Sequence, residues 1–66
     1  MRYQVIQRMD YIAELLRERG VINRSDLHNK FGISTPQASH DLKQFMELHP
    51  GQMEYDFQKR QYRVTK

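Results

Sequence analysis

The sequence has 66 residues, a net charge of +3 at pH 7 and a pI of about 9.5. A chain of this length buries only roughly 60% of its unfolded surface, so it can form one small core with little room for a catalytic pocket. It has no cysteine, which excludes disulfides and zinc thiolates, and no apolar run that could span a membrane or act as a signal peptide. We therefore expect one cytoplasmic domain over residues 1–66, with no membrane partner.

The first predicted helix covers about residues 2–19. Its apolar residues recur at the i, i+3, i+4, i+7 spacing of one helical face, and this stripe comprises Val5, Ile6, Met9, Ile12, Ala13 and Leu16. Gly20 follows a basic last turn, as expected at a helix end. Tyr3, Tyr11 and Leu15 lie off the stripe, where they could form an interface with a second copy.

A second helix is predicted over about residues 24–31, after the dipeptide Val21-Ile22, which could pair as a very short strand. Asn23 is a suitable N-cap, and Asp26 stands where a carboxylate favours the helix dipole. Gly32 ends this helix because glycine readily takes the left-handed conformation of the residue that follows a helix.

The third helix is predicted immediately afterwards, over about residues 35–48. Ser34 and Gln37 have the spacing of a capping box. Thr35, which precedes a proline, offers a competing start one residue later. The apolar stripe of this helix comprises Ala38, Leu42 and Phe45.

From residue 53 the period changes to two, which predicts a β-hairpin over about residues 53–64. Met53, Tyr55 and Phe57 alternate with acidic residues in the first strand. No Asn-Gly pair marks a tight turn, so we expect a longer loop around residues 58–60. Tyr55 and Tyr62 are expected to pack against the helices, although stacking on nucleic-acid bases is an alternative.

These elements predict a mainly α protein with a small β-hairpin (α+β), in the order α-β-α-α-β-β. Two short helices joined by a glycine turn form a helix-turn-helix unit, and a basic hairpin after it makes the unit winged. Residues 57–66 contain four basic residues and no acidic one, a local charge that suits a polyanion.

The third helix presents polar side chains away from its apolar stripe. Gln37 can pair with adenine through two hydrogen bonds, while Ser39 and His40 can make adaptable contacts to bases. The helix start at Ser34 also offers backbone N–H groups to a phosphate. Any amphipathic surface helix has a polar face, but the turn, the caps and the hairpin together favour contact with duplex DNA. Lys59 and Arg60 would contact its backbone or minor groove, and Arg24 could reach a phosphate.

Residues 22–64 resemble the N-terminal winged helix-turn-helix of WYL-domain transcriptional regulators, which belong to a DeoR-like group. The resemblance rests on R-S-D-L at the start of the second helix, F-G-I-S-x-P-Q-A-S-x-D-L through the turn and third helix, and H-P-G-x-M-x-Y-D with K-R-x-Y in the hairpin. It implies that the recognition-helix positions are Ser34, Thr35, Gln37, Ser39, His40 and Lys43. It also places Lys59 and Arg60 in the wing, and it makes Asp41 structural.

Members of this family are typically dimeric bacterial repressors, so the resemblance implies a repressor that binds double-stranded DNA, with a homodimer as one option. They also carry a ligand-sensing WYL domain, which this sequence lacks. We therefore expect either an excised DNA-binding domain or a stand-alone regulator, without a small-molecule ligand or a cofactor in this chain.

Other functions are weaker predictions. The histidines, His28, His40 and His49, fall on different elements without clustered carboxylates, so neither an enzyme nor a metal site is expected. A winged-helix module for protein docking is the main alternative, and it would require a large exposed apolar patch. Binding of RNA or single strands would require exposed aromatic residues.

Overall fold

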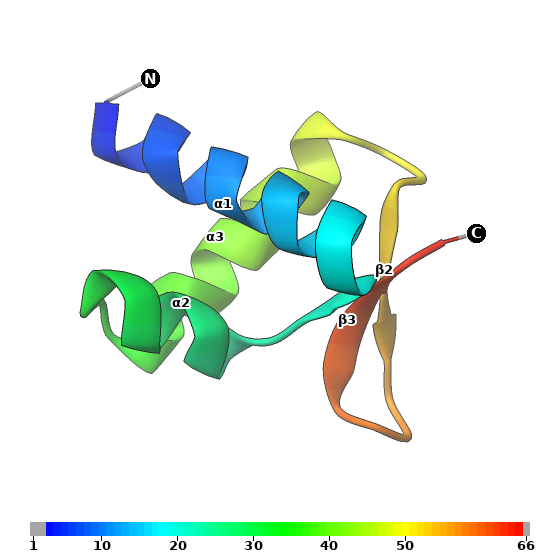
Figure 1. Ribbon diagram of the computed structural model, residues 1–66. Coiled ribbons are helices and arrows are strands. Elements are labelled where there is room, and N and C mark those ends of the chain that lie inside the picture. Colours follow the sequence, from blue (N-terminus) through cyan, green and yellow to red (C-terminus); the bar gives the residue numbers. More distant parts are fainter. Residues whose placement is uncertain (1–2, 66) are drawn as a thin grey trace.

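The computed structural model describes residues 3–65, which form three helices and a three-stranded antiparallel sheet (Figure 1). In chain order the elements are α1 (Tyr3–Arg19), β1 (Val21–Ile22), α2 (Arg24–Phe31), α3 (Thr35–Leu48), β2 (Met53–Asp56) and β3 (Gln61–Val64). The predicted mainly helical α+β class and winged helix-turn-helix architecture are confirmed. Arg2, predicted in the first helix, and Lys66, one of the basic residues near the C-terminus, lie outside the described residues.

The sheet places the hairpin beside the segment that joins α1 to α2. The strand order is β1-β3-β2, and the dipeptide of β1 pairs with β3 through Val21 opposite Arg63 and Ile22 opposite Tyr62. Within the hairpin, Tyr55 lies opposite Tyr62. Two residues suffice for β1 because the Gly20 carbonyl also accepts a hydrogen bond of 2.9 Å from the Val64 N–H.

One core joins the helices and the sheet. Its buried side chains are Met9, Ile12, Leu15, Leu16, Ile22, Leu27, Ala38, Leu42, Phe45 and Met53. Every element except β3 contributes to this set, and β3 adds the half-buried Tyr62 at its edge. Burying apolar surface from all elements is what fixes the angle between α2 and α3.

Three predictions about individual apolar side chains are wrong. Leu15, expected on a free surface, is only 7% exposed, because α1 is covered by α3 on one side and by β1 and β3 on another. Ile6, expected in the core, is 43% exposed. Phe57 is 83% exposed because β2 ends at Asp56 and Phe57 belongs to the turn.

The break between α2 and α3 depends on two local features. Gly32 has φ 69° and ψ 20°, the left-handed conformation that glycine adopts without strain, and its N–H donates to the His28 carbonyl. Ser34 is the N-cap of α3, and its Oγ accepts a hydrogen bond of 3.2 Å from the Gln37 N–H. The reciprocal half of the predicted capping box is absent among the described residues, because the Gln37 side chain donates to Asp41 instead.

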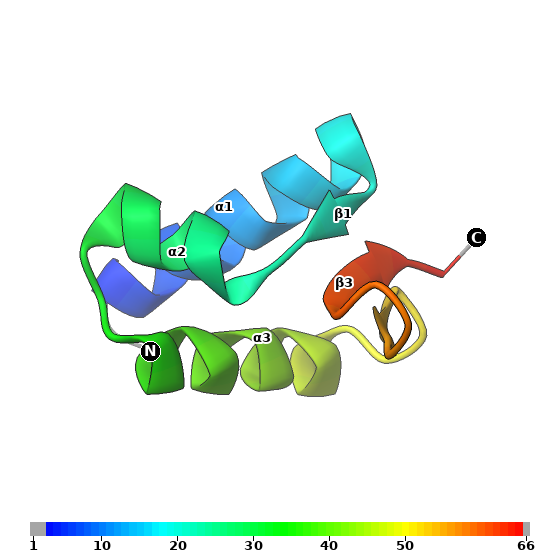
Figure 2. The ribbon, with the colours of Figure 1, turned by 90° about the horizontal axis from the view of Figure 1, so that it is seen from below.

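One long side of α3 is left uncovered by the other helices. Seen from below, α1 and α2 lie together on the opposite side of α3, and the hairpin lies beyond its C-terminal end (Figure 2). Within residues 3–65, none of the helices combines the length and the apolar character needed to cross a membrane.

Candidate nucleic-acid interface

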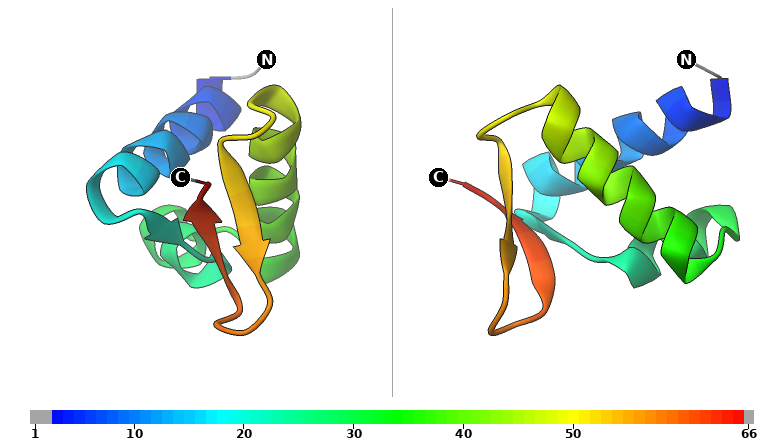
Figure 3. Two further views of the ribbon diagram at one scale, coloured as in Figure 1. Left: turned by 90° about the vertical axis from the view of Figure 1, so that its right-hand side faces the viewer. Right: turned by 180° about the vertical axis from the view of Figure 1, so that it is seen from behind.

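The uncovered side of α3 carries the polar side chains that the sequence indicates. Ser34, Thr35, His40 and Lys43 are exposed, whereas Gln37 and Ser39 are half-buried. The first turn of α3 and the tip of the hairpin extend toward the same end of the molecule in two further views (Figure 3). A single partner surface could therefore meet both.

The N-terminus of α3 differs from the prediction. A phosphate site was expected there, formed by free backbone N–H groups. Pro36 has no N–H, the Gln37 N–H donates to Ser34 Oγ, and the Ala38 N–H donates to the Ser34 carbonyl over 2.9 Å. Of the first four N–H groups, those of Ser34 and Thr35 have no acceptor within residues 3–65, so the capping that starts the helix leaves only part of the expected anion site.

Gln37 is held by its own helix. Its Nε2 donates a hydrogen bond of 3.0 Å to Oδ1 of Asp41, one turn further along α3. A glutamine amide has two N–H donors and one oxygen acceptor. This contact therefore uses one donor and leaves the other donor and the oxygen for a partner.

Asp41 lies entirely inside the protein, with 0% exposure. Its Oδ2 accepts a hydrogen bond of 2.5 Å from Arg8 Nε in α1, and its Oδ1 lies 3.4 Å from Arg8 Nη2. A buried carboxylate is tolerated only when it is paired and hydrogen-bonded. Asp41 is thus a structural residue, in line with the role that the resemblance implies.

Three of the nine candidate residues meet around one small cavity of about 160 Å³. Arg24 comes from the start of α2, Ser39 from α3 and Arg60 from the hairpin loop. The full lining is Asn23, Arg24, Ser39, Tyr55, Arg60 and Tyr62. These six described residues supply two guanidinium groups, several hydroxyls and no carboxylate, which is a donor set suited to a phosphate.

The electrostatics around Tyr62 agree with this arrangement. The pKa of Tyr62 is raised above its usual value of 10.0, chiefly by burial and then by the neighbouring Tyr55. The Arg24 guanidinium acts in the opposite direction and lowers this pKa, because its positive charge favours the phenolate. Arg24 is therefore close enough to the cavity for its charge to be felt there.

The hairpin loop is shaped by Asp56. Its Oδ1 accepts hydrogen bonds from the N–H groups of Gln58 and Lys59, at 3.0 and 3.2 Å, and Arg60 adopts a positive φ of 54°. This folded turn holds Lys59 and Arg60 exposed. By contrast, Arg63 forms an ion pair of 2.5 Å with Glu54, so its charge is largely compensated.

Sequence reasoning missed Phe57 as a functional candidate. It is the most exposed large apolar side chain described, and its ring lies edge-on to Tyr55 with 4.9 Å between centroids. The alternating pattern placed it in a strand. The Asp56-Phe57-Gln58-Lys59 segment, with an aspartate that can cap a turn, is the signal that could have moved it into the loop.

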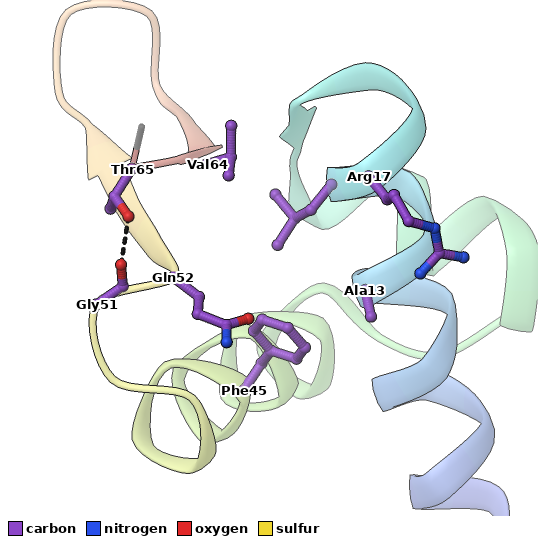
Figure 4. A pocket seen from close by; sticks show the side chains of 8 residues that line it. Ala13, Arg17, Phe45, Gly51, Gln52, Val64 and Thr65 are labelled. Atoms are coloured by element: carbon purple, nitrogen blue, oxygen red, sulfur yellow. Dashed lines mark hydrogen bonds between the residues drawn. The ribbon is translucent and has the colours of Figure 1, made fainter.

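A larger apolar cavity of about 460 Å³ lies away from this surface, between the second half of α1, the end of α3 and the ends of the hairpin (Figure 4). Thr65 Oγ1 donates to the Gly51 carbonyl at its edge. No candidate residue lines it, and among residues 3–65 no three metal-ligating side chains converge on a common site.

Comparison with known proteins agrees with this geometry. The family model described as the BrxR transcriptional regulator winged helix-turn-helix domain matches residues 4–66. The chain is 50% identical over 60 residues, 91% of its length, to a protein of Escherichia coli (strain KTE188) named DNA-binding transcriptional repressor CapW. It is 46% identical over 59 residues to a protein of that name from Pseudomonas aeruginosa, covering 89% of the chain, and 40% identical over 65 residues to one from Stenotrophomonas maltophilia, covering 98%. The matches span only 20%, 20% and 22% of those three relatives.

Proposed function

This chain belongs to the family of BrxR transcriptional regulator winged helix-turn-helix domains, and on that premise we propose that it binds double-stranded DNA sequence-specifically and acts in transcriptional repression. The chain spans only about a fifth of the length of the relatives named as DNA-binding transcriptional repressors. The proposal for this chain therefore rests on its own surface as well as on their names.

The observation that carries the proposal is the convergence of Arg24, Ser39 and Arg60 on one cationic cavity between α2, α3 and the wing. DNA presents phosphates at regular spacing on either side of its grooves, and contacts to them fix the register of a protein on the duplex. A phosphate seated in this cavity would lie between the uncovered side of α3 and the wing. That position suits a helix inserted in the major groove beside it.

In this arrangement the uncovered side of α3 faces the bases. Gln37 and His40 would contact base edges, with Ser34, Thr35 and Lys43 at the margins of the groove. Lys59 and Arg60 would lie on the backbone or in the adjacent minor groove. Phe57, on the same loop, would enter the minor groove, where apolar side chains of other proteins insert between base steps.

A homodimer is a further proposal, because a single domain of this size makes few base contacts. Two copies bound to inverted half-sites would be separated by one or more helical turns of roughly 10–10.5 base pairs each. Tyr3, which is 73% exposed, and the half-buried Tyr11 remain on the α1 surface expected to serve it. Analytical ultracentrifugation of the free protein and of its DNA complex measures the number of chains in each.

The function is tested by fluorescence anisotropy with a labelled random-sequence duplex, its separated strands and an RNA duplex, each over a salt series. We expect preferential binding to duplex DNA, with an affinity that falls steeply with salt. The variant Arg24→Gln/Arg60→Gln should lose affinity, whereas Arg17→Gln, on the far surface beside the apolar cavity, should not. Absence of duplex binding at low salt would contradict the proposal and favour the protein-docking function.

A further inference from the structure

We propose that Arg8 and Asp41 are positioning residues that orient the amide of Gln37, so that it selects a base carrying an exocyclic amino group, adenine or cytosine, in the major groove. This inference rests on the proposed DNA-binding function. It states which end of the Gln37 amide faces the base. It also assigns the control of that orientation in part to Arg8 of α1, which lies outside the recognition helix.

The geometry forms a continuous chain from α1 to the uncovered side of α3. Arg8 Nε donates to Asp41 Oδ2 over 2.5 Å, and Asp41 Oδ1 accepts from Gln37 Nε2 over 3.0 Å. The Arg8 side chain is 14% exposed and that of Asp41 only 1%, so water competes little for these bonds. The half-buried Gln37 is the member of the chain that reaches the surface.

The orientation of the Gln37 amide follows from the chemistry of its neighbour. A carboxylate paired with a guanidinium only accepts hydrogen bonds, so the Gln37 group that faces Asp41 must be the NH₂. The Gln37 oxygen is then directed away from Asp41, together with the second N–H. An uncharged amide side chain at position 41, such as asparagine, could accept or donate a hydrogen bond. Both orientations of the Gln37 amide would then be available.

An outward amide oxygen discriminates between bases. Adenine and cytosine present an amino donor in the major groove, whereas guanine and thymine present carbonyl acceptors there. An oxygen at the tip of Gln37 can accept from the first two, whereas the other two offer it no donor and can pair only with the second N–H. Adenine also offers N7 to the second N–H, so adenine should be preferred.

A buried ion pair is a costly way to join two helices. Apolar residues of similar size often give equal or greater stability than a buried pair, because desolvation of the two charges offsets their attraction. A purely structural clamp could therefore be apolar, whereas orienting an amide requires an acceptor. This contrast separates the two roles experimentally.

The decisive variant is Arg8→Met/Asp41→Leu, which replaces both charges by apolar side chains and removes the acceptor. Wild type, this variant and Gln37→Ala are compared on duplexes that differ only at the contacted base pair, with urea unfolding measured in parallel. We expect the wild type to favour adenine over guanine by roughly tenfold or more. The double variant should fold, keep the wild-type salt dependence and lose this preference, as Gln37→Ala does.

Adding Gln37→Ala to the double variant should then leave the ratio of adenine to guanine affinity unchanged, since the two alterations remove the same preference. A double variant that folds and keeps the wild-type preference would overturn the proposal and leave the pair as a clamp. A wild type that prefers guanine or thymine at the Gln37 contact, or a Gln37→Ala variant with unchanged preference, would also overturn it while leaving DNA binding intact. Failure of the proposed function would give a different result, because the wild type would then show no sequence preference at any base pair.

Should the double variant be unstable, Asp41→Asn provides the same test with the shape preserved. Asparagine can present either its oxygen or its NH₂ to Gln37. The preference for adenine over guanine should therefore narrow severalfold with little change in total duplex affinity. An unchanged ratio in a folded Asp41→Asn protein would contradict the proposed orientation.

Discussion

Arg8 in α1 and Asp41 in α3 are 33 positions apart in the sequence, yet Nε and Oδ2 lie 2.5 Å apart in a nearly dry environment. This ion pair joins α1 to α3. It also sits directly beneath the side chain that we expect to read a base.

Breaking that pair from one side should be severe. Arg8→Ala leaves a fully buried carboxylate without its cation, which costs about 3–5 kcal/mol of unfolding free energy. For a domain of this size that is a large part of the total stability. Urea unfolding followed by circular dichroism measures the change. Glu54→Gln, which breaks an exposed pair with Arg63, is the control and should cost less than about 1 kcal/mol. Equal losses for the two variants would contradict the buried role of Asp41.

Removing the Gln37 amide should affect base recognition far more than general binding. Gln37→Ala is expected to weaken binding to the preferred sequence by about 1–3 kcal/mol and to relax the preference at one base pair. Competition among duplexes that differ at single positions measures both effects. An equal loss on every sequence would exclude Gln37 from base reading.

Lys59 should behave in the opposite way, because it is expected to contact phosphate. Lys59→Ala should weaken all duplexes alike and reduce the slope of log affinity against log salt by about 0.9. Lys30→Ala is the matched control, since the Lys30 ammonium lies 5.6 Å from the Tyr11 ring centroid, on the far side of α2. Two results would contradict a phosphate contact by Lys59. One is a loss of affinity for Lys59→Ala that depends on the DNA sequence, and the other is an equal change of the salt slope for Lys30→Ala.

A substitution at Gly32, in the turn between α2 and α3, should lower stability through backbone strain and not through a steric clash. A Cβ at this position would meet no atom within 4 Å, so Gly32→Ala introduces strain without a clash. The left-handed conformation costs a non-glycine residue about 1–2 kcal/mol, and the free energy of unfolding should fall by that amount. Gly32→Asn should lose less, because asparagine tolerates this conformation. A neutral Gly32→Ala variant would contradict the observed φ of 69°.

Alkaline pH should destabilise the protein partly through Tyr62. Its folded-state pKa lies above the unfolded value of 10.0, so the folded protein holds the phenol proton more tightly than the unfolded chain. The resulting stability is fully present below pH 10.0 and is lost as the pH rises through the higher folded-state pKa. Tyr62→Phe should therefore show a shallower decline of unfolding free energy in this range. Identical pH profiles for the two proteins would contradict the raised pKa.

The elements of this fold were predictable because their signals are local. The i, i+3, i+4 stripe of α1, the cap at Ser34 and the stop at Gly32 each depend on a few neighbouring residues. The same holds for the period of two that marks the hairpin. Where a local signal met a competing one, prediction failed: Phe57 fits the strand period, but the carboxylate of Asp56 turns the chain before it.

The candidate site was only partly predictable for a different reason. Periodicity can assign Gln37 to an outward face, but it cannot show that Arg8 lies beneath it, since that contact depends on how α1 packs across α3. The cavity formed by Arg24, Ser39 and Arg60 likewise joins three elements and appears only once they are packed together. The phosphate site expected at the start of α3 has fewer free N–H groups than the sequence indicated, because Pro36 has none and the capping side chain of Ser34 accepts from the Gln37 N–H.

The most direct test of the central claim is selection from a randomised duplex library, with sequencing of the bound pool and binding of the enriched sequence followed over a salt series. A sequence-specific winged helix-turn-helix should enrich a defined motif containing an adenine whose preference disappears in the Gln37→Ala variant. An inverted repeat in that motif would indicate a pair of chains on the DNA. A bound pool with no enriched motif, or no bound pool at low salt, would contradict the claim that this domain reads DNA sequence.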